Sequence, residues 1–522
     1  MLNLNTMLIW IVLLNCGVAL VQGMRSREFV REWLAVMVLV PAAMGVTYLF
    51  APARAGYLGG ALWAVFILIP LLGASRNLRL SMQGRYARCA RLAAVLRLFH
   101  PSRDWWEMPL VFRAQHCAQQ GQYDEAAQLL EGIRNLNTPM GRMAMIYLFR
   151  MRSQWPEALA WMREQLGAAV IFSDISLLLF YLRALGETGD LPALLAAFQR
   201  GQQEIANGGA GAMQQAALFL FAFGGCRPGV EMVFAGALAS ASPDMRDFWL
   251  ATVAMVNGQP AAREQFIRLL DSPDAQVRAA AEYRLAHPLA DPADALGAEE
   301  LAVIARLQQE LTLEERYRPQ AQQMARAYAT YVLLAVNTAV FLVAVLLNAR
   351  TGGHETFEMT LYHLGAMVSF AYLGEDWWRP LTAMFLHANG LHLVMNMLAL
   401  LIFGRLVESR LGLARFLGTY FIAGIGSMLI AVAFLPNPHE ILIGASGALM
   451  GLVGAYGALA LAGWLRDRAK IALNQLSMIA IIIALQTIFD HITPQVSGAA
   501  HLSGAAIGFG VVMVMSMRGK GR

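Results

Sequence analysis

Two segments of this chain place residues capable of nucleophilic chemistry inside strongly apolar stretches. Ser446 stands in Gly-Ala-Ser-Gly-Ala at 444–448, and His501 stands in Ala-His-Leu-Ser-Gly at 500–504. A polar side chain within a hydrocarbon-length segment is costly and usually indicates a function. A nucleophile with its general base would justify both residues. For either residue alone, a hydrogen bond between two helices is the structural alternative.

The position of Ser446 suits the chemistry of acyl transfer. It begins an apolar run, where a helix N-terminus offers free N–H groups and a positive dipole end to a developing oxyanion. Glycines share a helix face with each candidate: Gly454 and Gly457 with Ser446, and Gly504 and Gly508 with His501. Helices faced with glycine approach closely, which would bring hydroxyl and imidazole within hydrogen-bond reach. Ordinary small-residue packing is the alternative explanation of the glycines.

Further polar residues lie on the preceding apolar run. His392 and Asn396 are four residues apart, hence on one helix face, and both could donate hydrogen bonds to a tetrahedral oxyanion. A structural polar zipper is the alternative. We expect His387 to order a loop, and Glu408 and Arg410, beside a turn, to fix helix ends.

Composition independently indicates a polytopic membrane protein. The chain of 522 residues is 57% hydrophobic and only 14% charged, with a mean hydropathy of +0.49. Its net charge of +5 comes from basic residues clustered beside apolar runs, which disfavours nucleic acid as a partner. The cysteines have no metal-ligand spacing and are expected to be buried, inert thiols, so neither a metal nor another cofactor is predicted. They are Cys16, Cys89, Cys117 and Cys226.

Runs of about 20 apolar residues predict the membrane spans. Three lie near the N-terminus, at 7–22, 33–51 and 57–74, and six follow at 328–348, 386–405, 415–435, 446–464, 474–490 and 497–516. The first is expected to be an uncleaved anchor rather than a signal peptide. Every second connection of the later group is basic, which predicts that both ends of this group face the cytoplasm, with a bacterial inner membrane assumed. The segment 350–383 is too broken to span and should lie outside.

The region between the two groups of spans is helical and repetitive. Candidate turns at Gly121, Gln154, Gly189, Gly224-Gly225 and Gly258 recur at about 34 residues, the tetratricopeptide period. A generic helical domain that binds nothing is the alternative.

The expected fold class is therefore all-α, a polytopic membrane protein with a six-helix core and a cytoplasmic helical-hairpin solenoid. The expected parts are an N-terminal transmembrane region (1–75), a basic amphipathic membrane-surface segment (76–104), a repeat domain (105–310), a charged linker helix (311–327) and a six-span domain (328–522).

Five ordered motifs within 375–515 resemble the rhomboid intramembrane serine proteases. They are Trp378-Arg379, His392-Leu393-Val394-Met395-Asn396, Glu408-Ser409-Arg410-Leu411-Gly412, Gly444-Ala445-Ser446-Gly447 and Ala500-His501-Leu502-Ser503-Gly504. The resemblance implies that Ser446 is the nucleophile and His501 the general base and later acid. It also implies an oxyanion hole of His392, Asn396 and the Ser446 N–H, with the other motif residues, among them Gly444 and Gly447, in structural roles.

The resemblance further implies hydrolysis of peptide bonds in single-span membrane proteins, close to the external membrane surface. Family members use a dyad without a carboxylate, and Asp490, at a span end, is not expected to assist His501. Met450 stands where the family often has a tyrosine packed on the histidine.

The repeats lie outside the region of resemblance, and they are expected to dock a cytoplasmic protein.

Other classes of protein remain in view. The main alternative is a non-proteolytic rhomboid-like receptor, although such relatives lack the serine and histidine. A metal-dependent membrane protease is disfavoured because no HExxH occurs. A transporter is disfavoured because no duplicated halves with broken helices are visible.

Overall fold

The chain is helical throughout the part that its computed structural model describes. That part comprises residues 4–25, 31–100, 103–133, 135–236, 238–317, 324, 326–368, 374, 376–434, 440–492 and 497–518, and it contains no strand. The chain forms two compact units, Leu2–Thr312 and Leu313–Arg522. Each unit is built around its own apolar core.

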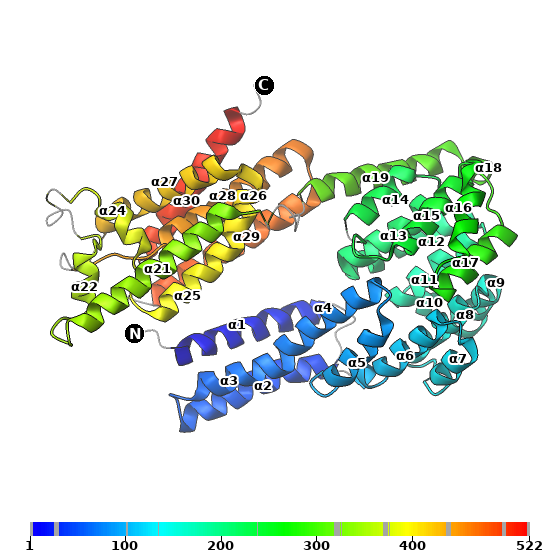
Figure 1. Ribbon diagram of the computed structural model, residues 1–522, viewed down its shortest axis with the longest axis horizontal. Coiled ribbons are helices and arrows are strands. Elements are labelled where there is room, and N and C mark those ends of the chain that lie inside the picture. Colours follow the sequence, from blue (N-terminus) through cyan, green and yellow to red (C-terminus); the bar gives the residue numbers. More distant parts are fainter. Residues whose placement is uncertain are drawn as a thin grey trace. The chain divides into compact units, whose positions relative to one another are not determined.

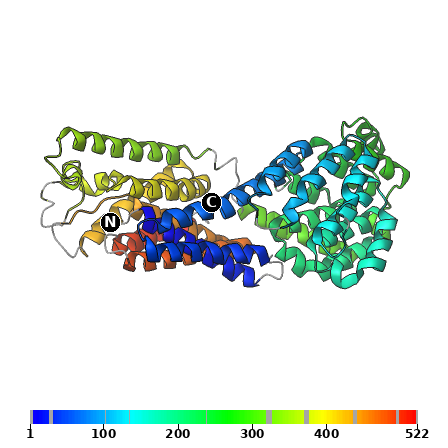
Figure 2. The ribbon, with the colours of Figure 1, turned by 90° about the horizontal axis from the view of Figure 1, so that it is seen from below.

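The N-terminal helices of the first unit pack on one another (Figure 2). They are α1 (Leu4–Arg25), α2 (Arg31–Phe50), α3 (Ala55–Trp63), the π-helical turn η1 (Ala64–Leu68) and α4 (Ile69–Met82). Because α3, η1 and α4 form one continuous apolar helix, the third predicted span extends beyond the expected domain boundary at 75.

The helices confirm a multi-pass, all-α membrane protein. Within the described ranges, eight helices are long and apolar enough to cross a membrane, and six of them lie in the second unit. The predicted span at 7–22 is not among the eight; it lies within α1, whose stretch Leu4–Gly17 is among the shorter apolar helices.

The basic segment after α4 folds back onto the protein. The apolar face of α5 (Tyr86–Leu96) is buried against α4 and α6, with Cys89 and Ala93 fully covered. Arg88 and Arg91 remain exposed on the opposite face. Protein therefore covers the apolar side of this helix, and the expected contact of the basic segment with a membrane surface stays a prediction.

The cysteines are free in this structure, and they are not uniformly buried, whereas the sequence predicted that all of them would be. Cys16 and Cys89 are buried, whereas Cys117 and Cys226 are only half-buried. Burial raises the pKa of the Cys89 thiol to about 11, so this thiol stays protonated at neutral pH.

Consecutive helices pack on each other through the rest of the first unit. They are η2 (Arg103–Trp106), α6 (Met108–Gln119), α7 (Tyr123–Glu131), α8 (Pro139–Met151), α9 (Trp155–Trp161), η3 (Met162–Leu166), α10 (Gly167–Ile171), α11 (Ile175–Glu187), α12 (Leu191–Asn207), α13 (Gly209–Phe223), α14 (Arg227–Ala235), α15 (Pro243–Val256), α16 (Ala261–Leu269), α17 (Ala275–Ala286), α18 (Pro292–Ala295) and α19 (Ala298–Tyr317).

The same turn geometry recurs five times in this region. Left-handed backbone occurs at Gly121, Ser153, Gly189, Gly225 and Gly258, at intervals of 32 to 36 residues. After each one, the next N–H donates to the carbonyl five positions earlier, a bond that ends a helix and starts the following one. One of the five turns uses a serine, directly before the Gln154 of the predicted turn.

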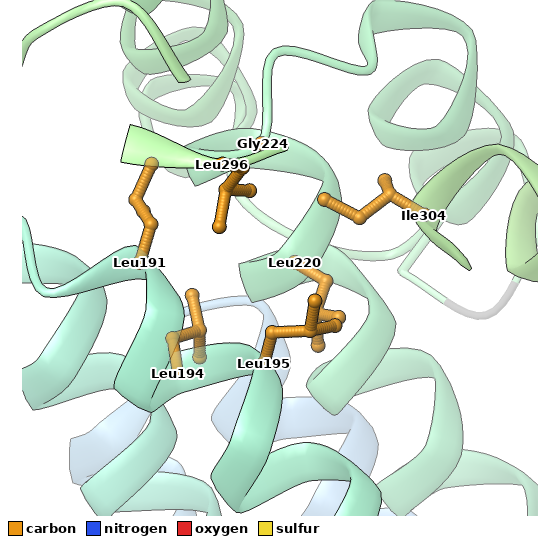
Figure 3. A pocket seen from close by; sticks show the side chains of 7 residues that line it. All are labelled: Leu191, Leu194, Leu195, Leu220, Gly224, Leu296 and Ile304. Atoms are coloured by element: carbon orange, nitrogen blue, oxygen red, sulfur yellow. The ribbon is translucent and has the colours of Figure 1, made fainter. Parts of the chain in front are cut away.

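An apolar seam holds the last helices of this unit to α12 and α13 (Figure 3). Side chains from α12 and α13 face others from the α18 and α19 region, and the described residues that line the seam are all uncharged. The lining residues are Leu191, Leu194, Leu195, Leu220, Gly224, Leu296 and Ile304.

The second unit begins inside α19, at Leu313, so the charged segment 311–327 is not a separate linker helix. Residues 318–323 and 325 of that segment lie outside the described residues. The helices that follow are α21 (Tyr328–Arg350), α22 (Phe357–His363), α24 (Arg379–Thr382), η4 (Ala383–Phe385), α25 (Gly390–Ala399), η5 (Leu400–Gly404), α26 (Arg405–Leu411), α27 (Leu413–Val432), α28 (Ser446–Asp467), α29 (Lys470–Ile492) and α30 (Gly498–Arg518).

Helix α28 is the centre of this unit and packs against α27, α29 and α30 (Figure 1). Its approach to α30 is a contact of backbone on backbone. A Cβ added to Gly504 would lie 2.1 Å from the carbonyl oxygen of Gly447, and one on Gly508 would lie 1.9 Å from that of Gly451. Gly454 meets α30 in the same way, whereas Gly457 faces Ile479 of α29.

Tyr317, the last residue of α19, forms hydrogen bonds with four polar residues of the second unit. Its hydroxyl donates to Asp467 at the end of α28 and accepts from Arg466 at 2.7 Å. Its carbonyl accepts from Arg410 and from Gln475, the latter at 3.0 Å. Hydrogen bonding to Asp467 and, above all, burial raise the pKa of this phenol. The end of α19 is therefore an integral part of the second unit.

We expect Gly508→Ala to destabilise the protein, because its methyl group would collide with the α28 backbone, which cannot rotate away. Overpacking of this kind costs about 1–3 kcal/mol. Thermal unfolding in detergent measures the effect. Gly510→Ala is the matched control on the same helix, since a Cβ there meets nothing within 4 Å. Equal unfolding temperatures for the two variants would contradict the close approach of the helices.

Candidate active site

The first turn of α28 lies against the first turn of α30. Ser446 is the first residue of α28, and a Cβ on its neighbour Gly447 would lie 3.6 Å from the carbonyl oxygen of Ala500. His501, the residue after Ala500, is buried, whereas Ser446 is half-buried. Ser446 and His501 therefore stand on contacting turns. No hydrogen bond joins them among the described residues, and such bonds are often long until a substrate binds.

His392 and Asn396 lie beside the loop that leads into α28. A Cβ on Gly444 would lie 2.9 Å from His392 Nε2 and 3.6 Å from Asn396 Nδ2, so only glycine allows this approach. The left-handed backbone of Gly444, with φ of 120°, imposes the same requirement. Asn389 caps α25 by accepting the N–H of His392 at 2.9 Å, which fixes the start of the helix that carries both donors.

Asn396 and His387 are buried polar residues with unused hydrogen-bonding atoms. Asn396 Nδ2 and both ring nitrogens of His387 have no partner within the described part of the chain. The rings of His387 and His392 lie 5.1 Å apart, edge to face. His387 thus contacts a candidate donor, beyond the loop-ordering role expected from sequence.

A carboxylate lies next to His501, contrary to the expectation from sequence. Asp490, in the last turn of α29, is 2.9 and 3.0 Å from His501 Nδ1 through its two oxygens. Gln486 Nε2 donates to Asp490 Oδ1 at 2.8 Å. Asp490 was set aside because it ends a span, yet His501 itself stands near a span end. The signal in the sequence was the pair Gln486 and Asp490, one helical turn apart and just before the connection to α30.

The remaining motif residues hold the framework of the site. Arg379 is buried, donates to the carbonyls of Tyr362 and Ala366 at 2.9 Å each, and pairs with Asp376 at 2.8 Å. Trp378 precedes α24, and the guanidinium of Arg379 stacks over its ring at 5.2 Å. These contacts fix the irregular segment that precedes α25; residues 369–373 and 375 of that segment lie outside the described residues.

Two charged residues act at helix ends. Glu408 accepts from the N–H groups of Ala329 and Thr330 at 2.9 and 2.8 Å, and so caps the start of α21. Arg410 donates to the carbonyl of Tyr317 at the end of α19.

Met450, which is not charged, is buried in α28 among apolar neighbours. None of Glu408, Arg410 and Met450 belongs to the group of polar side chains around His501.

Fold and site together define a multi-pass helical membrane protein in which a serine, a histidine and candidate anion-binding donors gather where spanning helices begin and end. The Rhomboid domain of known families matches residues 374–518. The chain belongs to the rhomboid family.

Three relatives illustrate the range of the similarity. RHOMBOID-like protein 6, mitochondrial, of Arabidopsis thaliana is 37% identical over 162 residues, which are 30% of this chain and 50% of that protein. Rhomboid protease GluP of Bacillus subtilis is 31% identical over 201 residues, 38% of this chain and 37% of that protein. Rhomboid protease AarA of Providencia stuartii is 30% identical over 202 residues, 34% of this chain and 69% of that protein. The chain spans about half the length of the first of these relatives.

Proposed function

We propose that this chain is an intramembrane serine endopeptidase that hydrolyses peptide bonds in or near the transmembrane segments of membrane proteins. The observation that carries the proposal is the contact between the first turns of α28 and α30, which bear Ser446 and His501. The names of GluP and AarA as proteases agree with it.

In the proposed mechanism, Ser446 Oγ attacks the scissile carbonyl carbon while His501 takes the hydroxyl proton. The protonated imidazole then gives that proton to the leaving amine, and an acyl-enzyme remains. Water attacks the ester with His501 again as base, which releases the acid product and restores the serine. Every proton that the histidine takes is returned within the cycle, so no cofactor is required.

The proposed oxyanion hole uses donors from two helices. Asn396 Nδ2 and His392 point at the Gly444 turn, and the backbone N–H of Ser446 lies at the free N-terminus of α28. Donors fixed before the reaction stabilise the negative charge of the tetrahedral intermediate without further reorganisation. The unpartnered amide of Asn396 is consistent with this role.

For orientation, we propose that the candidate site faces the outside of a bacterial inner membrane. Ser446 begins α28, Asp490 nearly ends α29 and His501 nearly begins α30, so alternating spans place all three on one side. The opposite ends of α28 and α29 carry Arg466 and Lys470, as expected of cytoplasmic ends. The six spans from 328 would form the rhomboid-like core in contact with lipid.

We assign binding roles to the helical region 105–310 and to the basic segment 76–104. The five equivalent turns support a tetratricopeptide-like solenoid over 105–310, and such arrays offer extended surfaces to proteins. We assign to it the docking of a cytoplasmic protein or substrate tail. The exposed Arg88 and Arg91 of the basic segment would meet anionic lipid.

Ser446→Ala and His501→Ala should each abolish cleavage of a reporter transmembrane substrate, because a nucleophile and its base act as one unit. Their single losses cost on the order of 10³–10⁶ in rate. Ser477→Ala and His491→Ala, on exposed positions of α29, are the matched controls and should cleave normally. Cleavage that survives in a well-expressed Ser446→Ala variant would contradict the assignment of Ser446 as the nucleophile, whereas a wild-type chain that cleaves nothing would favour the receptor alternative.

Asn396→Ala should lower kcat by roughly 10²-fold while leaving KM nearly unchanged, because an oxyanion donor acts chiefly in the transition state. Steady-state kinetics in detergent separate the two constants. Asn474→Ala, on an exposed position of α29, controls for loss of an amide. If only KM changes, Asn396 binds substrate and has no part in the oxyanion hole.

A chain beginning at Leu311 should retain turnover of a generic substrate, because it keeps Tyr317 and every span of the second unit, whose backbone bonds close within helices. Its loss should be confined to selectivity or regulation. A chain beginning at Ala327 lacks the Tyr317 contacts and should unfold at a lower temperature. Should the Leu311 chain fold but fail to cleave, the first unit would be part of the enzyme itself.

A further inference from the structure

Asp490 and His501 form a buried, charge-assisted hydrogen bond at the centre of the proposed site. The side chains are only 6% and 9% exposed, respectively, and Asp490 Oδ2 lies 2.9 Å from His501 Nδ1. A carboxylate removed from water is costly unless it is paired, so this arrangement needs a compensating role or partner. The imidazole of His501 is the cation-forming group that it contacts.

Neighbouring residues fix the carboxylate in place. Gln486 lies one turn earlier on α29 and donates to Oδ1 at 2.8 Å, while the imidazole Nδ1 lies 3.0 Å from Oδ1 and 2.9 Å from Oδ2. Gly498, at the start of α30, would place a Cβ only 3.3 Å from Asp490 Cβ, so the small residue allows the two helix ends to meet. The carboxylate therefore has one orientation, set by α29 and aimed at α30.

The chemistry of the pair determines the tautomer of His501. An ionised carboxylate only accepts hydrogen bonds, so the ring nitrogen facing it, Nδ1, must carry the proton. The other nitrogen, Nε2, then holds the lone pair and can accept the proton of the Ser446 hydroxyl. Gln486 Nε2, at 3.2 Å from Nδ1, is also a donor, so its hydrogen bond goes to the carboxylate instead.

The geometry points to Asp490 as a positioning residue that, together with Ser446 and His501, makes the site a Ser-His-Asp triad. This inference rests on the proposed function and departs from the carboxylate-free dyad that the family resemblance implies. When Ser446 Oγ bonds to the substrate carbonyl, its proton passes to His501 Nε2, and the cation so formed is stabilised by Asp490. The carboxylate itself takes no proton, and the imidazolium returns its Nε2 proton to the leaving amine.

A set of Asp490 variants in the full-length chain tests the inference. Asp490→Asn keeps the shape but can donate to Nδ1, which favours the tautomer with the proton on Nε2. We expect kcat to fall about 10²–10⁴-fold with KM changed less than about twofold, by analogy with loss of the carboxylate in other triads. Asp490→Glu should recover part of kcat. Glu440→Gln removes an exposed carboxylate outside the helices and should leave kcat unchanged.

Histidine ¹⁵N spectra of the wild-type chain provide a readout that needs no variant at Asp490 to fold. The signal absent from His501→Gln should report an Nδ1-protonated ring, and an Nε2-protonated ring would overturn the inference. Wild-type kcat in Asp490→Asn would overturn it too, as would a loss explained by a lower unfolding temperature. Ser446→Ala separates the two proposals: if it is inactive while Asp490→Asn is fully active, only the triad fails. If Ser446→Ala retains activity, the proposed function as a protease with Ser446 as nucleophile fails, and the triad with it.

Discussion

The contact of backbone on backbone between α28 and α30 is the constraint on which the second unit depends. Leucine-faced helices are held apart by their side chains, and at that separation a serine hydroxyl could not approach an imidazole on the neighbouring helix. Gly504 and Gly508 remove the side chains that would stand between the two helices. Dispersion between close backbones replaces the hydrophobic effect, which gives no net drive between helices in lipid.

The second unit also buries several polar and charged side chains among its apolar helices. Glu408 is satisfied by the start of α21, Arg379 by two carbonyls and a carboxylate, and Asp490 by a glutamine and an imidazole. Each of these buried charges is matched by groups on another element, so each also fixes the position of that element. Asn396 and His387 differ, since they keep unpaired atoms within the described residues, next to the turn that leads to Ser446. These three buried charges thus have structural partners, whereas Asn396 and His387 keep unpaired atoms beside the candidate site.

The sequence predicted those features that depend on one helix at a time. Apolar runs located the eight qualifying spans, and helical spacing put His392 with Asn396 and Gly504 with Gly508 on shared faces. It could not show which helix ends meet. Asp490 was therefore missed, although it is eleven residues before His501, because periodicity describes a helix face and says nothing about the turn between helices. For the same reason the amphipathic pattern of α5 indicated an apolar face but did not show that α4 and α6 cover it. The boundary between the two units lies within α19 because Tyr317 is bound by residues far away in the sequence. The periodicity of a single helix could not show these contacts either.

Helix α28 joins the two ends of the second unit in one rigid element. Ser446 is its first residue and Asp467, the acceptor of the Tyr317 hydroxyl, is its last. Its 22 residues span about 33 Å, close to the thickness of the hydrocarbon layer. Glycine contacts hold its first half closely against α27 and α30. A displacement of the Asp467 end along the helix axis would therefore also displace Ser446 at the opposite end.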